Sequence, residues 1–323
     1  MPVTNVEKDL DALTMTITAD FPVPVERLWR AYVDPRQIER FWGPTTYPAT
    51  FVRHDVRVGG ESHYVMHGPD GDVSAGYWHF LAVDEGRSFT VRDGFATDEG
   101  GTPNAEMPDM QMDFVFSSTD EGSRVVMTTL FGSLEELENL ISLGMEEGTL
   151  SAMSQIDDVL ADLAAFAAGE AELKVLSDTQ VRVSRLIRGD IEQVWRAHND
   201  ADLVRRWMLG PDGWTMPVCE LAAEVGDTYR YEWEQEGGEG RFGFTGELLE
   251  VSPPRRSVTT EAMIGMEGSS TTNEMTLTPV EGGTLLITVI TYPSLELRDT
   301  VLATGMVDGM EAGYARLERE ILV

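Results

Sequence analysis

The amino-acid sequence contains one series of short motifs twice, in the same order. The offset between the two copies stays at about 160 to 168 residues, and chance matches would not keep both order and spacing. The chain is therefore a tandem duplication of one folding unit of about 150 residues. The recurring motifs are Trp29-Arg30-Ala31 with Trp195-Arg196-Ala197, Gly43-Pro44 with Gly210-Pro211, Val58-Gly59 with Val225-Gly226, Tyr64 with Tyr231, and Gly144-Met145 with Gly305-Met306.

The duplication divides the chain into two predicted domains, residues 1–168 and 176–323. Each is long enough to bury its own hydrophobic core. The seam from Ala167 to Ser177 is short and of mixed composition. We therefore expect the two domains to be close neighbours with limited freedom.

The composition excludes several classes of protein. A net charge of −32 would repel the phosphates of nucleic acids and an anionic membrane surface. Cys219 is the single cysteine, so neither an internal disulfide nor a cysteine-based metal site can form. The segment from Met1 to Asp20 has neither a basic start nor an apolar signal core. We therefore predict a cytoplasmic protein.

Each copy ends in a segment whose apolar residues recur three or four positions apart, as in an amphipathic helix. These segments, 133–163 and 294–322, predict one long closing helix in each domain. Both begin at a serine, a residue type that caps helix starts. Ser133 is followed by Glu136, which predicts a reciprocal capping pair, whereas Ser294 lacks that acid.

Each predicted closing helix has small residues at every fourth position. A glycine inside a helix costs about 1 kcal/mol relative to alanine, so this row needs a reason beyond helix propensity. Either the helix packs very closely against the sheet, or it leaves space there for a guest molecule. A membrane-spanning role is excluded, because acidic residues interrupt the run and no apolar stretch reaches about 18 residues. The small residues are Gly144, Gly148 and Ala152 in the first copy and Gly305, Gly309 and Gly313 in the second.

Each copy predicts an opening strand, a pair of short helices and six further strands before the closing helix. Period-two alternation places apolar residues on one face of the sheet and polar residues on the other. The apolar face must be covered, and the closing helix is the candidate cover. The predicted fold class is α+β, with two tandem domains in which a curved antiparallel sheet wraps around a C-terminal helix. The residues placed on the covered face include Met110, Met112, Phe114, Phe116, Val125 and Met127, and in the second copy Met275, Leu277, Leu285, Ile287 and Val289.

The order of these motifs resembles the START-like (SRPBCC) helix-grip superfamily. Within it, the chain is most similar to proteins resembling the C-terminal domain of the activator of the heat-shock protein 90 ATPase. The resemblance covers nearly the whole chain, but the second copy departs from the pattern at Trp207 to Pro211, where a residue is inserted and an aromatic residue is lost. The resemblance implies an apolar cavity for lipids, sterols or polyketides, and some members are cyclases or hydrolases. It supplies no catalytic motif that these residues match.

Motifs for nucleotide binding, a nucleophilic serine or a zinc protease do not occur in the sequence. We therefore expect no cofactor and no metal. His63, His67 and His79 fall on polar strand positions, where we expect exposed histidines rather than a surface metal site. His54 differs, because alternation turns it toward the covered face. A lone inward histidine is either a satisfied core group or a general base.

Two functions from different classes fit these observations. One is a binding protein that holds an apolar small molecule or assists a chaperone. The other is a cyclase- or hydrolase-like enzyme that uses His54 as general base in the first cavity, with Asp93 as the candidate for a second titratable group. The inward residues are mostly methionine, aromatic and aliphatic, which favours binding. We predict a non-enzymatic binding protein without nucleic-acid or membrane partners.

The predicted ligand-binding residues lie on the covered face of each sheet and on the closing helices. The first copy has an inward histidine and the second does not, so we expect the first cavity to be the more selective. The residues are His54, Tyr64, Met66, Trp78, Met112, Phe114, Met145 and Gly148 in the first copy and Tyr231, Trp233, Phe244, Met275, Met306 and Gly309 in the second.

Overall fold

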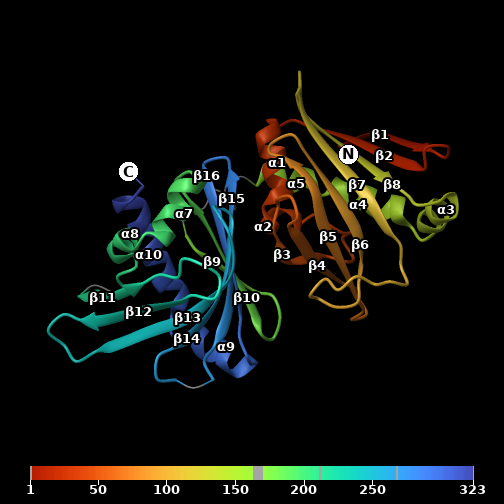
Figure 1. Ribbon diagram of the computed structural model, residues 1–323. Coiled ribbons are helices and arrows are strands. Elements are labelled where there is room, and N and C mark those ends of the chain that lie inside the picture. The colour runs from red at the N-terminus through yellow and green to blue at the C-terminus, as the bar shows by residue number, and fades with distance from the viewer. Residues whose placement is uncertain (1, 163–169, 211–212, 267, 323) are drawn as a thin grey trace. The chain divides into compact units, whose positions relative to one another are not determined.

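The computed structural model describes residues 2–162, 170–210, 213–266 and 268–322. The chain forms two compact units, Met1–Phe166 and Ala167–Val323 (Figure 1). Each unit contains one eight-stranded antiparallel sheet together with a helix pair and closing helices. The predicted α+β class, with two helix-grip domains in tandem, is confirmed.

The first unit has its strands in the sheet order β1-β2-β8-β7-β6-β5-β4-β3. Its helix pair follows β2, and three further helices follow β8. The elements are β1 Val3–Asp9, β2 Thr14–Phe21, α1 Val25–Val33, α2 Pro35–Ile38, β3 Ala49–His54, β4 Glu61–His67, β5 Val73–Asp84, β6 Ser88–Ala96, β7 Asp109–Thr119, β8 Gly122–Leu130, α3 Leu134–Ser142, α4 Met145–Ser154 and α5 Ile156–Ala161.

The second unit has the sheet order β11-β12-β13-β14-β15-β16-β10-β9. Its helix pair follows β10, and its closing helices follow β16. The elements are β9 Glu172–Val175, β10 Gln180–Ile187, α7 Ile191–Asn199, α8 Ala201–Trp207, β11 Trp214–Glu220, β12 Thr228–Gln235, β13 Arg241–Ser252, β14 Arg256–Met263, β15 Thr271–Val280, β16 Gly283–Thr291, α9 Leu295–Leu302 and α10 Met306–Glu320.

Each sheet has one strand more than the sequence analysis predicts. β1 pairs with β2 in the first unit, and β9 pairs with β10 in the second. β1 is largely exposed and β9 has only four residues, so neither shows the apolar alternation by which a half-buried strand is recognised. β9 also lies inside the predicted seam, whose first residues, 167–169, are outside the described part of the chain.

The two helix pairs differ in length at the place where the sequence has its insertion. α2 has four residues and α8 has seven. Trp207 at the end of α8 is buried, donates from Nε1 to the Ala197 carbonyl at 2.9 Å, and stacks on Tyr314 of α10. The second unit therefore uses this tryptophan to join its helix pair to the closing helix.

The prediction of one continuous closing helix is wrong in both units. α3 and α4 are separated at Gly144, where φ is 90°, and α9 and α10 at Gly305, where φ is 80°. Both angles lie in the left-handed region, which glycine adopts readily and which ends an α-helix. In the first unit Gln155 separates α4 from α5, and residue 163, the predicted end, lies outside the described residues.

The predicted capping pair at Ser133 forms in one direction only. The Ser133 hydroxyl accepts a hydrogen bond from the Glu136 N–H at 3.2 Å. The Glu136 carboxylate accepts from the Gly132 N–H at 2.7 Å instead of returning to Ser133. The acid therefore holds the turn that precedes the helix, and the helix start still receives its serine cap.

Of the other glycines in the row, Gly313 packs closely against a neighbour, whereas Gly148 and Gly309 do not. A Cβ atom built on Gly148 or Gly309 would meet no heavy atom within 4 Å. Gly148 is half-buried and Gly309 is exposed. Gly313 differs, because its Cβ would lie 3.4 Å from the Trp207 ring. The close-packing interpretation is therefore wrong for Gly148 and Gly309.

Strand register shows which side chains share the covered face of the first sheet. Met110, Met112, Phe114 and Phe116 on β7 are all buried, and their neighbours alternate toward solvent. Val125 pairs with Phe116 and is buried on the same face. The predicted orientation of β7 and β8 is confirmed.

The predicted orientation of β16 is wrong. Met275 pairs with Thr288, and Leu277 pairs with Leu286, so the even-numbered residues of β16 share the covered face. Leu277 and Leu286 pack in one cluster with Tyr314 of α10, which fixes that face. Buried apolar residues occupy both faces of β16, and the threonines also lie on both faces, Thr288 on the covered face and Thr291 on the other, so a simple polar–apolar alternation does not mark the covered side. The residues that face the other way are Leu285, Ile287 and Val289.

Candidate functional site

The part of the first sheet formed by β4 to β7 carries one charged residue among uncharged ones on its covered face. On strands β4 to β7, the residues of this face are apolar, aromatic or small, apart from Asp93 on β6. Trp78 donates from Nε1 to Asp93 Oδ1 at 2.8 Å, and the Tyr64 hydroxyl donates to the same oxygen at 3.1 Å. Trp78 and Tyr64 are buried. Asp93 thus connects side chains from three neighbouring strands.

A glycine on β5 allows Tyr64 to reach Asp93. Tyr64 and Gly76 are cross-strand partners. A Cβ at Gly76 would lie only 2.4 Å from Cζ of the Tyr64 ring, so any other residue would displace the ring. The tyrosine therefore lies across Gly76 with its hydroxyl directed at the carboxylate.

Trp42, in the segment that follows the first helix pair, packs against this group. Its ring centroid lies 4.6 Å from that of Trp78 and 6.1 Å from that of Tyr64, both in edge-to-face geometry. The indole Nε1 is buried and makes no hydrogen bond of normal geometry within the described part of the chain. We call Trp42, Tyr64, Trp78 and Asp93 the first polar cluster.

The surroundings of Asp93 disfavour its charged form. Burial raises the pKa of Asp93 from its usual 3.8 to about 6, and the hydrogen bonds from Trp78 and Tyr64 offset only part of this effect. Burial, followed by the Asp93 charge, raises the pKa of Tyr64 well above its usual 10.0. The Trp42 N–H lowers that pKa, which places the indole nitrogen beside the Tyr64 oxygen. Tyr64 therefore remains a hydrogen-bond donor at neutral pH.

The second sheet carries a carboxyl group at the corresponding place. Glu261 lies on β14, the fourth strand after the helix pair, as Asp93 lies on β6. On strands β12 to β15 it is the charged residue of the covered face. The Tyr229 hydroxyl lies 3.3 Å from Glu261 Oε2 and donates to the Thr260 carbonyl at 2.8 Å. We call Tyr229, Glu261 and Asn273 the second polar cluster.

The second cluster repeats the packing of the first. Tyr229 and Gly246 are cross-strand partners, and a Cβ at Gly246 would lie 2.8 Å from the tyrosine ring. Burial raises the pKa of Glu261 above its usual 4.5, and hydrogen bonds from Tyr229 and Asn273 act in the opposite direction. Burial and then the Glu261 charge also raise the pKa of Tyr292 to about 12. Glu261 therefore lies among tyrosines, as Asp93 lies among aromatic rings.

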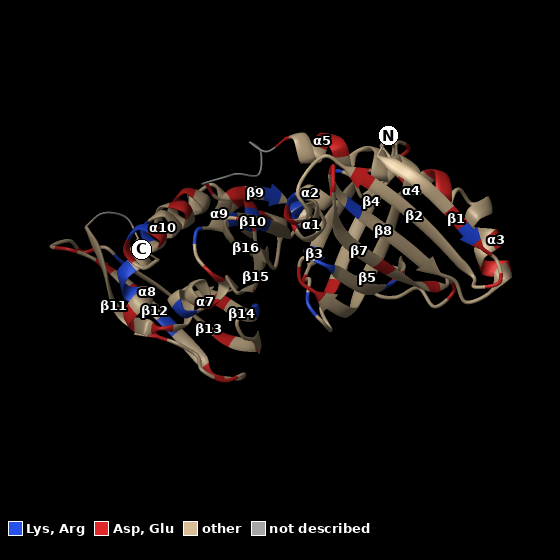
Figure 2. Ribbon diagram, turned by 90° about the horizontal axis from the view of Figure 1, so that it is seen from above, with Lys and Arg blue, Asp and Glu red and all other residues tan. Residues whose placement is uncertain are grey.

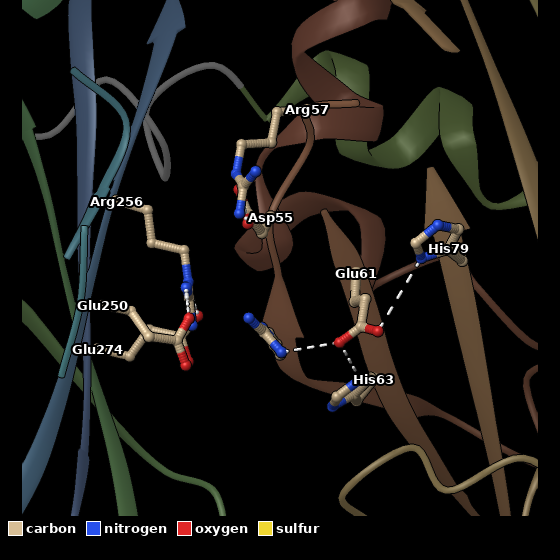
Figure 3. A network of polar contacts seen from close by, with 9 residues as sticks. Asp55, Arg57, Glu61, His63, His79, Glu250, Arg256 and Glu274 are labelled. Carbon is tan, nitrogen blue, oxygen red and sulfur yellow. Dashed lines mark hydrogen bonds and ion pairs between the residues drawn. The ribbon is translucent and has the colours of Figure 1, made fainter. Parts of the chain in front are cut away.

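On the outer face of the first sheet, in contrast to Asp93, the carboxylate of Glu61 is paired with basic side chains. Glu61 on β4 accepts a hydrogen bond from Arg53 at 2.9 Å. It also lies 3.4 Å from His63 Nε2 and 4.0 Å from His79 Nδ1 (Figure 3). His67 is exposed and the other two histidines are half-buried. Among the residues that the structure describes, no group of three or more His, Cys, Asp or Glu is arranged to hold a metal ion.

The outer face of the second sheet shows the same kind of pairing. Arg256 on β14 donates from Nε to Glu274 at 2.8 Å and also binds Glu250 (Figure 3). Both carboxylates therefore have a cationic partner. Asp93 and Glu261 on the covered faces have no arginine or lysine partner within the described residues, unlike Glu61, Glu250 and Glu274 on the outer faces.

His54 is buried on the covered face, as predicted from alternation. Its Nδ1 lies 2.7 Å from the Ser62 hydroxyl, and its Nε2 lies 2.9 Å from the Tyr32 carbonyl oxygen. A carbonyl only accepts, so Nε2 carries the proton and Nδ1 accepts from Ser62. Both ring nitrogens are thus engaged, as in a satisfied core histidine.

The structure brings together most of the predicted residues of the first unit. Tyr64, Trp78 and Phe114 form one aromatic group, with the His54 ring 6.2 Å from that of Trp78. Met66 is close to Gly43, at the end of the helix pair. The other predicted residues are Met112, buried on the covered face, and Met145 and Gly148, half-buried on α4.

The predicted residues of the second unit divide among three clusters on the covered face. Tyr231, Trp233 and Phe244 form an aromatic group beneath α8. Met275 packs with Trp207 and Tyr314. Met306 packs with Val181, Ile290 and Tyr292, while Gly309 is exposed on α10.

Sequence reasoning identified Asp93 but missed Trp42, Tyr229, Glu261 and Asn273 as members of the polar clusters. Trp42 lies just after the helix pair, where a large aromatic residue most often packs in the core. Glu261 had a detectable signal, since alternation from Met263 places it on the same face as that methionine. The pairing of Tyr229 with Gly246 needs the strand register, which the sequence does not provide.

Acidic residues outnumber basic ones in both units, as the excess of red over blue shows in Figure 2. They lie on strands and helices alike. Within the described residues, no helix has both the length and the apolar character required to cross a membrane.

The fold and the two clusters define a class of protein: tandem helix-grip domains, each with an apolar covered face and one partly buried carboxyl group. Residues 22–161 and 188–321 match the family model described as activator of Hsp90 ATPase homolog 1-like protein. The chain belongs to this family and contains its domain twice. No curated protein matches the chain.

Several solved structures are similar to one half of the chain. The crystal structure of protein Ms6760 from Mycobacterium smegmatis is 48% identical, with 49% of this chain and 97% of that chain covered and a TM-score of 0.46. A solution structure from Arthrobacter aurescens is 39% identical, with 50% and 92% covered and a TM-score of 0.47. A crystal structure from Rhodobacter sphaeroides is 31% identical, with 46% and 96% covered and a TM-score of 0.44.

Proposed function

We propose that this protein is a non-enzymatic binding protein that holds an apolar small molecule against the covered face of each sheet. The observation that carries the proposal is a polar cluster with incomplete hydrogen bonding, set among apolar and aromatic residues of the covered face. Small-molecule sites commonly combine apolar walls, which give affinity, with a few polar groups, which fix orientation.

The incomplete hydrogen bonds belong to the first polar cluster. The Trp42 indole N–H is buried and lies beside the Tyr64 hydroxyl oxygen without a hydrogen bond of normal geometry, so its capacity to donate is not fully used. Asp93 receives both of its hydrogen bonds on Oδ1, so Oδ2 retains its capacity to accept. A ligand whose polar end lies between these groups would supply the missing contacts.

A second observation that supports the proposal comes from Gly148 on α4 of the first unit. Gly148 is half-buried, yet a Cβ there would meet no heavy atom within 4 Å. One turn later Ala152 and Met153 are buried, so the helix is in contact with the core at that level. This difference along α4 supports the interpretation that the glycine leaves space for a guest.

The alternative, a cyclase- or hydrolase-like enzyme with His54 as general base, has less support. A general base needs a free lone pair within reach of the substrate proton. The lone pair of His54 Nδ1 is engaged by Ser62, and Nε2 is engaged by the Tyr32 carbonyl. The geometry therefore favours a structural role for this histidine.

A second candidate follows from the family description, which names an activator of the Hsp90 ATPase. Assistance to a chaperone would be recognised as a faster ATPase rate of an Hsp90 chaperone when this protein is added. Assistance to a chaperone gives no reason for a polar cluster on the covered face of each sheet, whereas ligand binding does. We therefore place ligand binding first.

A titration with Nile red, a neutral dye that fluoresces in apolar surroundings, tests the proposal. Wild-type protein should enhance the dye fluorescence in a saturable way. Met112→Trp adds a large ring on the covered face and should weaken the enhancement, because overpacking fills the space that the dye needs. Gln111→Trp places the same ring on the opposite face of β7 and is the matched control.

Circular dichroism should show that both tryptophan variants remain folded. Equal dye binding by the two variants would contradict the assignment of the covered face as the site. Absence of any saturable enhancement by the wild-type protein would contradict the proposed function itself.

A further inference from the structure

We infer that each unit recognises an apolar amine, whose cationic end lies against Asp93 in the first unit and Glu261 in the second. This inference rests on the proposed function and adds the chemical class of the ligand. Its basis is the environment of the two carboxyl groups, which lie on the covered faces among aromatic side chains and, among the described residues, have neutral hydrogen-bond donors only.

The first argument is charge. A buried carboxylate is normally paired with a cation or held neutral, because its desolvation is costly. The outer-face acids Glu61 and Glu274 have arginine partners. Asp93 has only the neutral donors Tyr64 and Trp78. An ammonium group would supply the missing counter-charge and bind the free Oδ2.

The second argument is the ring of aromatic side chains around Asp93. The centroids of Trp42, Tyr64 and Trp78 lie 4.6 to 6.3 Å from one another. Ammonium groups are attracted to the faces of such rings, most strongly to tryptophan. A carboxylate together with several aromatic rings therefore matches a cation better than an anion.

The third argument is that the second unit repeats the arrangement with different residues. Glu261 also lacks a cationic partner within the described residues, and it accepts hydrogen bonds from Tyr229 and Asn273. The rings of Tyr229 and Tyr231 have centroids 5.0 Å apart. Both domains thus place one acid on the fourth strand after the helix pair, with a tyrosine lying across a glycine to reach it. Divergent side chains with the same chemistry indicate a shared requirement for a carboxylate.

A competition experiment with bound Nile red tests the inference. The probes are decylamine, 1-decanol and decanoic acid, which share one apolar chain and differ in the polar end. At about pH 7.5 the amine is a cation and the acid an anion. Decylamine should displace the dye at a concentration about tenfold lower than 1-decanol, because a charge-assisted hydrogen bond is about twice as strong as a neutral one. Decanoic acid should be the weakest competitor.

Removing the charge should abolish most of this discrimination. In Asp93→Asn, in Glu261→Gln and in the double variant, the ratio between the 1-decanol and decylamine concentrations that displace the dye should fall to about twofold or less. The net charge of the chain would attract any amine, so matched controls remove one outer-face carboxylate each. Asp113→Asn on β7 and Glu247→Gln on β13 change the net charge by the same amount, and they should keep the tenfold preference.

The outcomes separate this inference from the proposed function. If the dye binds but decanoic acid competes as well as decylamine, the amine assignment is wrong and apolar binding stands. A preference for amine that survives in the double variant would equally overturn the roles of Asp93 and Glu261. If the wild-type protein does not bind the dye at all, the proposed function fails first.

Discussion

Replacing Asp93 with asparagine should change how the stability of the first unit depends on pH. Asparagine keeps the size of the side chain and an oxygen that can accept from Trp78 and Tyr64, but it cannot ionise. Burial raises the pKa of Asp93 from 3.8 to about 6. This difference corresponds to about 3 kcal/mol, since each pH unit between the two pKa values contributes about 1.36 kcal/mol.

The direction of the effect follows from the raised pKa. The folded protein binds the proton of Asp93 more tightly than the unfolded chain does. The stability that this group contributes is therefore complete below about pH 3.8 and is lost as the pH rises through about 6. The variant lacks this loss, so its stability relative to wild type should increase by about 2 to 3 kcal/mol between about pH 4 and pH 7.5.

Hydrogen exchange, followed by mass spectrometry, measures the stability of the first unit separately from that of the second when peptides from β6 and β7 are monitored. Wild type and variant are compared at the same pH, so the intrinsic exchange rate cancels. Met112→Leu, on the same face but without a titratable group, should differ from wild type by the same amount at both pH values. A difference between wild type and Asp93→Asn that does not change with pH would refute the reasoning.

Four further substitutions test the helix glycines, a buried ion pair and a buried hydrogen bond. Gly148→Ala should stabilise the first unit by about 0.5 to 1 kcal/mol, because the position is helical and uncrowded, whereas Gly144→Ala, at φ 90°, should destabilise it by about 1 to 2 kcal/mol. Arg185→Leu should destabilise the second unit by about 3 kcal/mol, because it leaves two α10 carboxylates without their cation. His54→Leu should cost about 1 to 3 kcal/mol by leaving the Ser62 hydroxyl unpaired. Urea unfolding measures all of these changes.

The same unfolding curves show what would contradict these predictions. A stabilising Gly144→Ala would mean that the break between α3 and α4 is not fixed by the glycine backbone. An unchanged midpoint for Arg185→Leu would show that its ion pairs contribute nothing to the docking of α10. A His54→Leu variant as stable as wild type would contradict the role of His54 as a satisfied core residue.

The parts of the fold that the sequence predicts are those controlled by local pattern. The duplicated motifs predict two copies of one unit, and alternation on β7 places Met112 and Phe114 on the covered face. The same alternation turns Asp93 inward. Each of these conclusions depends on residues close together in the sequence, where periodicity is a direct consequence of strand geometry.

The parts that the sequence does not predict depend on backbone conformation or on contacts between distant strands. Gly144 fits a helical pattern, and only its left-handed φ shows that it ends the helix. Leu285 and Leu286 are both buried, so alternation alone assigned the wrong one to the covered face. The tyrosine contact with Glu261 requires the register of β12, β13 and β14, which no local pattern specifies.

The central claim is that each unit holds an apolar ligand at its partly buried carboxyl group. Native mass spectrometry of the intact chain equilibrated with decylamine tests it most directly, because it counts bound molecules. With free decylamine near the wild-type dissociation constant each site is half occupied, so we predict a mean of about one bound molecule per wild-type chain and a maximum of two. A roughly fivefold loss of affinity at each altered site predicts a mean of about 0.7 for Asp93→Asn or Glu261→Gln alone and about 0.3 for the double variant. The same number of bound molecules in all four proteins, or none in wild type, would contradict the claim.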